Sequence, residues 1–180
     1  MPNRRDLFRG FVLSWSLLVL PLAAQTPAPN WSQFRGAPRL SGVTTPPLPD
    51  TLSLKWTFDA GEAIESSAAI VDGAVYVGST KGELVAIDLQ SGKLRWTYST
   101  GQNGSIGESS AASADGAVFI GDLAGLVHAV SASDGRQIWT FKTDGEVKSS
   151  PVVVDDLVLI GSYDTHLTRS TGAPGSCGGS

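Results

Sequence analysis

The chain has 180 residues, of which 41% are hydrophobic and 17% charged, and its formal net charge is −4. This length fits one domain, and the 21 glycines fit a globular protein with many tight turns between β-strands. No basic patch or run occurs, so nucleic acid is excluded as an expected partner.

The first 24 residues have the pattern of a targeting segment rather than of a folded element. An arginine-rich start is followed by an apolar run over 11–22, which is too short for a membrane-spanning helix, and then by two alanines that fit a cleavage site. Arg4 and Arg5 resemble the pair of a twin-arginine export signal. The alternative is an ordinary secretory signal that happens to hold adjacent arginines. We expect a periplasmic or secreted protein.

Residues 25–50 are rich in Pro, Thr and Ser and predict an extended lead-in. This composition favours turns and open backbone over a core element. Two aromatic residues in it, Trp31 and Phe34, are available to dock on the folded part of the chain.

A unit of 40 residues then repeats, with three extra residues in its second copy. Three residue types keep the same spacing of 40 and 43 residues: a tryptophan, a pair of adjacent serines and a glycine. They are Trp56, Trp96 and Trp139; the pairs that begin at Ser66, Ser109 and Ser149; and Gly78, Gly121 and Gly161. Because independent residue types share one phase, the chain is a repeat protein.

The sequence pattern of each unit predicts four strands. In the first copy they are Ser66–Val71, 74–78, 83–88 and 94–98, and in the second Ser109–Ala114, 117–121, 126–131 and 137–141. Asp72-Gly73 and Asp115-Gly116 predict two-residue hairpins, because both central residues of a type I′ turn need φ > 0. Asp155-Asp156 is a weaker version of the same turn.

The second strand of each unit is apolar without alternation, as in Ala74-Val-Tyr-Val, Ala117-Val-Phe-Ile and Leu157-Val-Leu-Ile. A strand has this composition when both faces of its sheet are covered. Four-stranded sheets that cover one another, at about 40 to 45 residues a unit, are the blades of a β-propeller. A helical solenoid has a similar period, but no apolar spacing of 3.6 residues occurs. We therefore expect an all-β partial propeller of about two and a half to three blades over residues 51–167.

The repeat resembles the tryptophan-docking motif of the PQQ-like propeller repeat family, which includes quinoprotein dehydrogenases and BamB-like proteins. The residues that carry the resemblance are Ala86, Asp88, Gly92 and Trp96 in the first copy and Ala129, Gly135 and Trp139 in the second, where Ser131 replaces the aspartate. The resemblance implies that each tryptophan packs on the neighbouring blade. The segment Trp31-Ser-Gln-Phe-Arg-Gly36 also resembles an opening common in exported proteins of this class.

The resemblance implies two functions. The first is an exported, non-catalytic binding or scaffold propeller with a protein partner and no cofactor. The alternative is the N-terminal part of a quinoprotein dehydrogenase that oxidises alcohols or sugars with PQQ and Ca²⁺. Gln25 stands where a BamB-like lipoprotein has its lipidated cysteine, so no lipid anchor is expected.

The pattern stops after Leu167. The tryptophan expected near 179 is absent, and residues 168–180 form a Gly- and Ser-rich tail that is not expected to form a core strand. Propellers close with about four to eight blades, so the remaining blades are missing. We interpret the chain as a truncated product whose reading frame shifts after 167. The alternative is a short protein that assembles from several copies.

No active site is predicted. His128 and His166 lie in different units without metal-ligand spacing, and are expected to be packed or solvated. Cys177, the only cysteine, has no positioned base. The repeated serines lack a Gly-x-Ser-x-Gly turn, and the glycines in 101–107 are followed by no helix, which excludes a dinucleotide fingerprint.

Three charged residues precede the serine pairs at equivalent positions, and we expect them near the axis. They are Glu65, Glu108 and Lys148. In a quinoprotein, two carboxylates there could help to hold Ca²⁺, but lining a wet channel is the simpler interpretation.

Overall fold

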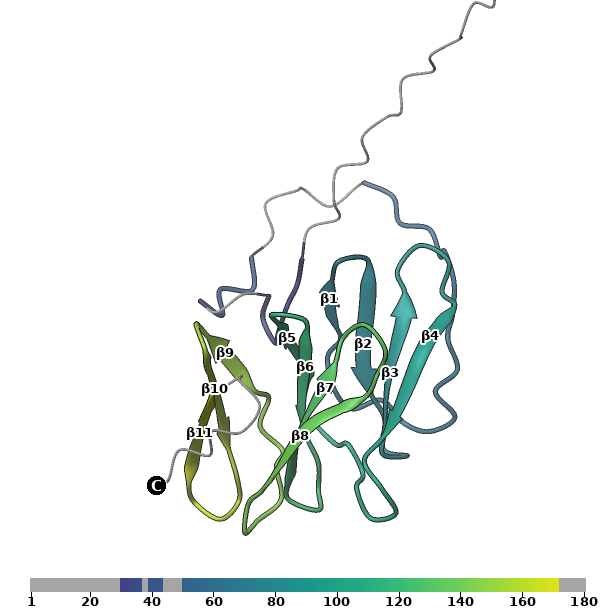
Figure 1. Cartoon of the computed structure of the whole chain (residues 1–180). Coiled ribbons are helices and arrows are strands. Elements are labelled where there is room, and N and C mark those ends of the chain that lie inside the picture. The colour runs from purple at the N-terminus through teal and green to yellow at the C-terminus, as the bar shows by residue number, and fades with distance from the viewer. Residues whose placement is uncertain (1–29, 37–38, 44–49, 172–180) are drawn as a thin grey trace, which may run out of the picture.

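The computed structural model describes residues 30–36, 39–43 and 50–171, and the part described is built from strands in three antiparallel sheets. Figure 1 shows the three sheets standing side by side like adjacent blades. Blade 1 contains β1 (Ala69–Val71), β2 (Ala74–Gly78), β3 (Glu83–Asp88) and β4 (Leu94–Ser99). Blade 2 contains β5 (Ala112–Ala114), β6 (Ala117–Gly121), β7 (Leu126–Ser131) and β8 (Gln137–Lys142). Blade 3 contains β9 (Val152–Val154), β10 (Leu157–Gly161) and β11 (Leu167–Thr171).

Within each blade, strands that follow one another in the chain are also neighbours in the sheet. The first strands β1, β5 and β9 contact one another from blade to blade and therefore surround the propeller axis. The expected all-β partial propeller is confirmed. None of the described segments forms a helix that could span a membrane.

The hairpins between the first and second strands adopt the left-handed turns that their sequence predicts. Asp72 and Gly73 have φ of 49° and 71°, and Asp115 and Gly116 have 49° and 75°. Aspartate tolerates this region better than most residues, and glycine occupies it without steric cost. Asp155 begins the third hairpin in the same way, with φ of 53°.

The core lies between blades. Every residue of β2 and β6 is buried, as their unbroken apolar sequences predict. Glycines at the ends of these strands make room for the next blade, because a Cβ on Gly78 would collide with Ile106 and one on Gly121 with Val147. Ile106, which lies in the same loop as the three extra residues of the second unit, is 0% exposed and belongs to the core.

Several strand boundaries differ from the prediction. β4 and β8 each end one residue later than predicted, at Ser99 and Lys142. The first strands begin at Ala69 and Ala112, three residues later than predicted, because the serines before them bond to neighbouring blades instead of extending the ladder. At the other end, β11 continues to Thr171, four residues past the predicted limit of the repeat at 167. Pairing with β10 uses main-chain groups, so this edge strand needs no apolar side chains. Residues 172–180, which include Cys177, lie outside the described residues.

Candidate functional site

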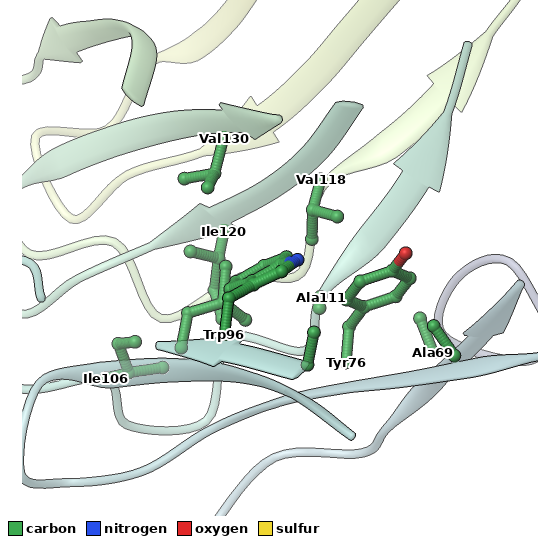
Figure 2. Close-up of a cluster of buried hydrophobic side chains, with 11 residues drawn as sticks. Ala69, Tyr76, Trp96, Ile106, Ala111, Val118, Ile120 and Val130 are labelled. Atoms are coloured by element: carbon green, nitrogen blue, oxygen red, sulfur yellow. The ribbon is translucent and has the colours of Figure 1, made fainter. Parts of the chain in front are cut away.

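Trp96 joins blade 1 to blade 2. Its Nε1 donates a hydrogen bond to the carbonyl oxygen of Ala132 at 3.0 Å, and its ring covers Gly135, where a Cβ would lie 2.8 Å from the indole. Figure 2 shows Trp96 at the centre of the buried cluster, between Tyr76 of its own blade and Val118 and Ile120 of the next. Only 9% of its surface is exposed.

Trp56 makes the same contacts one unit earlier. Its Nε1 donates to the carbonyl oxygen of Leu89 at 3.0 Å, and its ring covers Gly92, where a Cβ would lie 2.6 Å away. Both glycines have φ near +70°, so their turns present a bare backbone to the indole. Trp139 stacks on Phe119 of its own blade with 5.8 Å between ring centroids. The positions equivalent to its docking turn lie outside the described residues.

The other residues of the motif build the surface that receives the tryptophan. Ala86 and Ala129 are 0% exposed and pair with Trp96 and Trp139 across the third and fourth strands. Their lack of a long side chain leaves space for the indoles. A register shift follows each alanine and turns the fourth strand.

Asp88 organises the turn on which Trp56 docks. Its carboxylate accepts hydrogen bonds from the amide and hydroxyl of Ser91, each at 2.8 Å, and from Arg95 at 2.7 Å. The Arg95 guanidinium, followed by the Ser91 groups, holds the pKa of Asp88 well below its usual range. In blade 2 Ser131 occupies the equivalent position, and its hydroxyl lies 3.0 Å from that of Ser133.

The serine pairs form a ladder around the axis. The second serine of each pair accepts, through its hydroxyl, the amide of the equivalent serine one blade earlier: Ser67 N–H to Ser110 at 2.9 Å, and Ser110 N–H to Ser150 at 3.0 Å. Among the first serines, Ser109 accepts the amide of Gly121 in its own blade at 3.0 Å and donates its hydroxyl to the carbonyl oxygen of Ser149 in the next blade at 2.9 Å. These hydroxyls are therefore engaged in holding blades together.

A buried polar network between blades 1 and 2 was not predicted. Asp122 and His128, 0% and 1% exposed, lie 3.0 Å apart between Oδ2 and Nε2, and His128 Nδ1 lies 2.9 Å from the hydroxyl of Tyr98 in blade 1. The hydroxyl of Tyr98 also donates to Oε1 of Gln137 at 3.0 Å. Burial, and then the charge of Asp122, raises the pKa of Tyr98, so the phenol keeps its proton.

The charged residues expected near the axis do not form a metal site in the part of the chain that is described. Lys148 Nζ lies 3.9 Å from Glu108 and 3.6 Å from Glu146, and 5.3 Å from the centroid of the Tyr163 ring. Glu108, followed by Tyr163, raises the pKa of this lysine, which keeps its charge. Among the described residues, no three His, Cys, Asp or Glu side chains lie close enough together to hold a metal.

A cavity of about 260 Å³ lies between blades 2 and 3. Its wall is mainly apolar, with Phe119 at one side and three aspartates of the hairpins among the lining residues: Ala114, Asp115, Ala117, Phe119, Val153, Asp155, Asp156 and Val158. Among the described residues, none fills this space.

The remaining candidates lie apart from one another. His166 is exposed and lies 3.4 Å from Asp164. The loop 101–107 turns back on the blades, where Ser105 binds the carbonyl oxygen of Thr80 at 2.8 Å. Arg4 and Arg5 of the predicted export signal lie outside the described residues.

The family profile described as outer membrane protein assembly factor BamB matches residues 49–110 and 102–176. The chain belongs to this family of PQQ-like propeller repeats. The resemblance seen in the sequence is thereby confirmed. No curated protein matches the sequence of this chain.

Solved structures share the fold. BamB from Moraxella catarrhalis is 23% identical with a TM-score of 0.61, and the match covers 69% of this chain and 38% of that one. A quinohemoprotein alcohol dehydrogenase from Pseudomonas putida HK5 is 21% identical with a TM-score of 0.69, over 79% of this chain and 25% of that one. The quinohemoprotein alcohol dehydrogenase from Comamonas testosteroni is 22% identical with a TM-score of 0.65, and the match covers 77% of this chain and 24% of that one. This BamB-family chain therefore spans less than two fifths of the length of these proteins.

Proposed function

We propose that the chain is an exported, non-catalytic propeller module that binds a protein partner. The observation that carries this proposal is the use of the repeated residues. The docked tryptophans contact glycines of the next blade, and the serines bond to serines of the next blade. Because the repeated residues pack the blades together, the outer loops are the part of the module that remains to bind a partner. The family description, an assembly factor of the outer membrane, supports a protein partner.

The second candidate is the N-terminal part of a PQQ-dependent dehydrogenase, which the similarity to quinohemoprotein alcohol dehydrogenases favours. The described residues at the axial mouth do not fit Ca²⁺, which takes six to eight oxygen ligands. An ammonium group, that of Lys148, stands at the third equivalent position beside Glu108. An ammonium supplies no lone pair and repels a cation.

A binding experiment separates the two candidates. PQQ is titrated into the full chain with CaCl₂ while tryptophan fluorescence is recorded, and dye reduction with ethanol and glucose is then measured. We expect neither quenching beyond that of a free-tryptophan control nor turnover. Saturable quenching that requires Ca²⁺ would favour the dehydrogenase. The variant Lys148→Glu, which places a third carboxylate at this mouth, should bind Ca²⁺ more tightly than the parent chain.

Export is tested with a fluorescent reporter fused after residue 24. Because the twin-arginine route carries folded proteins, we expect the reporter to reach the periplasm in a fluorescent state, and the double variant Arg4→Lys, Arg5→Lys to stay in the cytoplasm. Equal export of both fusions would identify an ordinary secretory signal. Retention of both would contradict an export role for these residues.

A further inference from the structure

Residues 30–36, here called the axial segment, lie at the hairpin end of the three first strands (Figure 1). Trp31 pairs with Ile70 of β1 through two hydrogen bonds, N–H to O in both directions, each 2.7 Å long. The carbonyl oxygen of Ser32 accepts the amide of Ser113 in β5 at 2.7 Å. The side-chain oxygen of Gln33 accepts the amide of Val153 in β9 at 3.1 Å.

The three amides that the axial segment binds are equivalent. Ile70, Ser113 and Val153 are the middle residues of β1, β5 and β9 and stand 43 and 40 residues apart. In an antiparallel edge strand, alternate residues direct their N–H and C=O groups away from the sheet. The first strands therefore offer one free amide per blade to the axis, and three consecutive residues of the axial segment bind three consecutive blades.

The shape of the axial segment depends on four of its residues. Gly36 has φ of +97°, and a Cβ there would lie 3.0 Å from the ring of Trp31, so the indole packs on a bare backbone. Two main-chain bonds close the turn, Ser32 N–H to Gly36 O at 2.9 Å and Gly36 N–H to Gln33 O at 2.8 Å.

Gln33 provides the contact with the third blade. The main chain turns away after Ser32, so a side chain has to reach β9, and Gln33 does so while only 2% exposed. Its Nε2 has no hydrogen-bond partner within the described ranges. A buried donor without a partner is costly, so the contact with Val153 has to outweigh that cost.

We propose that the hairpin end of the axis is a peptide-binding site for turn-forming peptides of the pattern Trp-x-Gln-x-x-Gly, and that residues 31–36 occupy it in cis. The first residues of such a peptide bond to strand edges through the main chain, as in strand addition, and the glutamine side chain reaches the third blade. While the axial segment is bound, this end of the axis is closed to other peptides of this kind.

The test uses the full chain and a double variant, Trp31→Ala with Gln33→Ala. Binding of a fluorescein-labelled hexapeptide Trp-Ser-Gln-Phe-Arg-Gly is measured by anisotropy, with a scrambled hexapeptide as control. We expect the double variant to bind the labelled peptide at least about tenfold more tightly than the parent chain, because the cis segment no longer competes. The variant Phe34→Ala, which alters an exposed residue of the same segment, should behave like the parent.

Equal binding of the hexapeptide to both chains, or binding to neither at millimolar concentration, overturns the proposal. Amide exchange of the unaltered chain, resolved by residue, gives a second measurement that does not depend on how the variant folds. We expect Ile70, Ser113 and Val153 to exchange slowly, and Gln33→Met to accelerate Val153 roughly fivefold to tenfold while affecting the other two less. Exchange of all three at the rate of an unstructured peptide also overturns it.

Discussion

The interface between blades 1 and 2 and the interface between blades 2 and 3 are built from equivalent strands but are packed differently. In the first, Trp96 is buried and hydrogen-bonded to Ala132, and a cluster of apolar residues encloses it (Figure 2). In the second, Trp139 is half-buried and a cavity of about 260 Å³ remains. The docking turn of Trp96 is described, and the positions equivalent to it for Trp139, 172 and 175, lie outside the described residues.

This comparison shows where a propeller of this kind obtains its stability. The strands of one blade form locally, but each sheet covers its apolar face only against a neighbour. The turn around Gly135 completes the first interface, because it supplies a carbonyl group and a bare backbone to Trp96. Single substitutions that remove or add a contact in one of the two interfaces test this interpretation.

The largest difference is expected from the two tryptophans. Trp96→Ala should lower the free energy of unfolding by about 3–5 kcal/mol, since it empties a buried site. Trp139→Ala should cost about 1–2 kcal/mol, because the side chain of Trp139 is only half-buried. Urea unfolding followed by far-UV circular dichroism measures both, and equal losses would contradict the comparison.

The next prediction separates the steric collision of an added Cβ from the strain of a left-handed backbone. Gly135 and Gly116 have nearly the same φ, 74° and 75°, but a Cβ would meet the Trp96 ring at the first and nothing within 4 Å at the second. Gly116→Ala should cost about 1 kcal/mol for the left-handed backbone alone. Gly135→Ala should cost about 2–4 kcal/mol, because the indole is also displaced. A difference near zero in urea unfolding would show that Trp96 does not need this close approach.

A smaller effect comes from exchanging one residue between the interfaces. Val71 packs against the first interface, and its equivalent Ala114 lines the cavity in the second. Val71→Ala should destabilise by roughly 1 kcal/mol, and Ala114→Val should stabilise by up to about 1 kcal/mol by filling space. Thermal unfolding of the two variants shows whether each substitution raises or lowers the stability of the fold. Destabilisation by Ala114→Val would mean that the cavity cannot take an added group.

The smallest effect concerns the two docking turns, one with Asp88 and the other with Ser131. The folded-state pKa of Asp88 lies below that of the unfolded chain. Its contribution is therefore complete above about pH 4 and is lost as the pH falls through the folded pKa. Asp88→Asn should lower stability above pH 5, and its difference from the parent should shrink below pH 4. A difference that stays constant with pH in urea unfolding would show that the ionised carboxylate contributes nothing.

The sequence predicted the parts of the fold that depend on local patterns. β2, β3, β6 and β7 have the predicted bounds, because their apolar runs end at turn residues, which include Asp72-Gly73 before β2 and Asp115-Gly116 before β6. The start of the first strands could not be found in this way. A serine before a strand can extend the ladder or bond elsewhere, and the choice depends on a partner 40 or 43 residues away.

The buried network of Asp122, His128 and Tyr98 was missed for a related reason. His128 was noted as a packed or solvated residue, but its partners lie on another strand and in another blade. One sequence signal was available. Where the first unit has Ser79 and Val85, the second has Asp122 and His128, and two polar changes that occur together in one unit indicate a contact.

The serine ladder around the axis has a consequence for how such chains change in evolution. The amide of Ser67 binds the hydroxyl of Ser110, and the amide of Ser110 binds the hydroxyl of Ser150, so each rung joins a blade to its immediate successor. Duplicating or losing one complete unit in the gene would leave every surviving rung with a matching partner, whereas a partial unit would leave one unmatched. Recombination between copies can therefore lengthen or shorten the array in whole steps without the invention of a new interface.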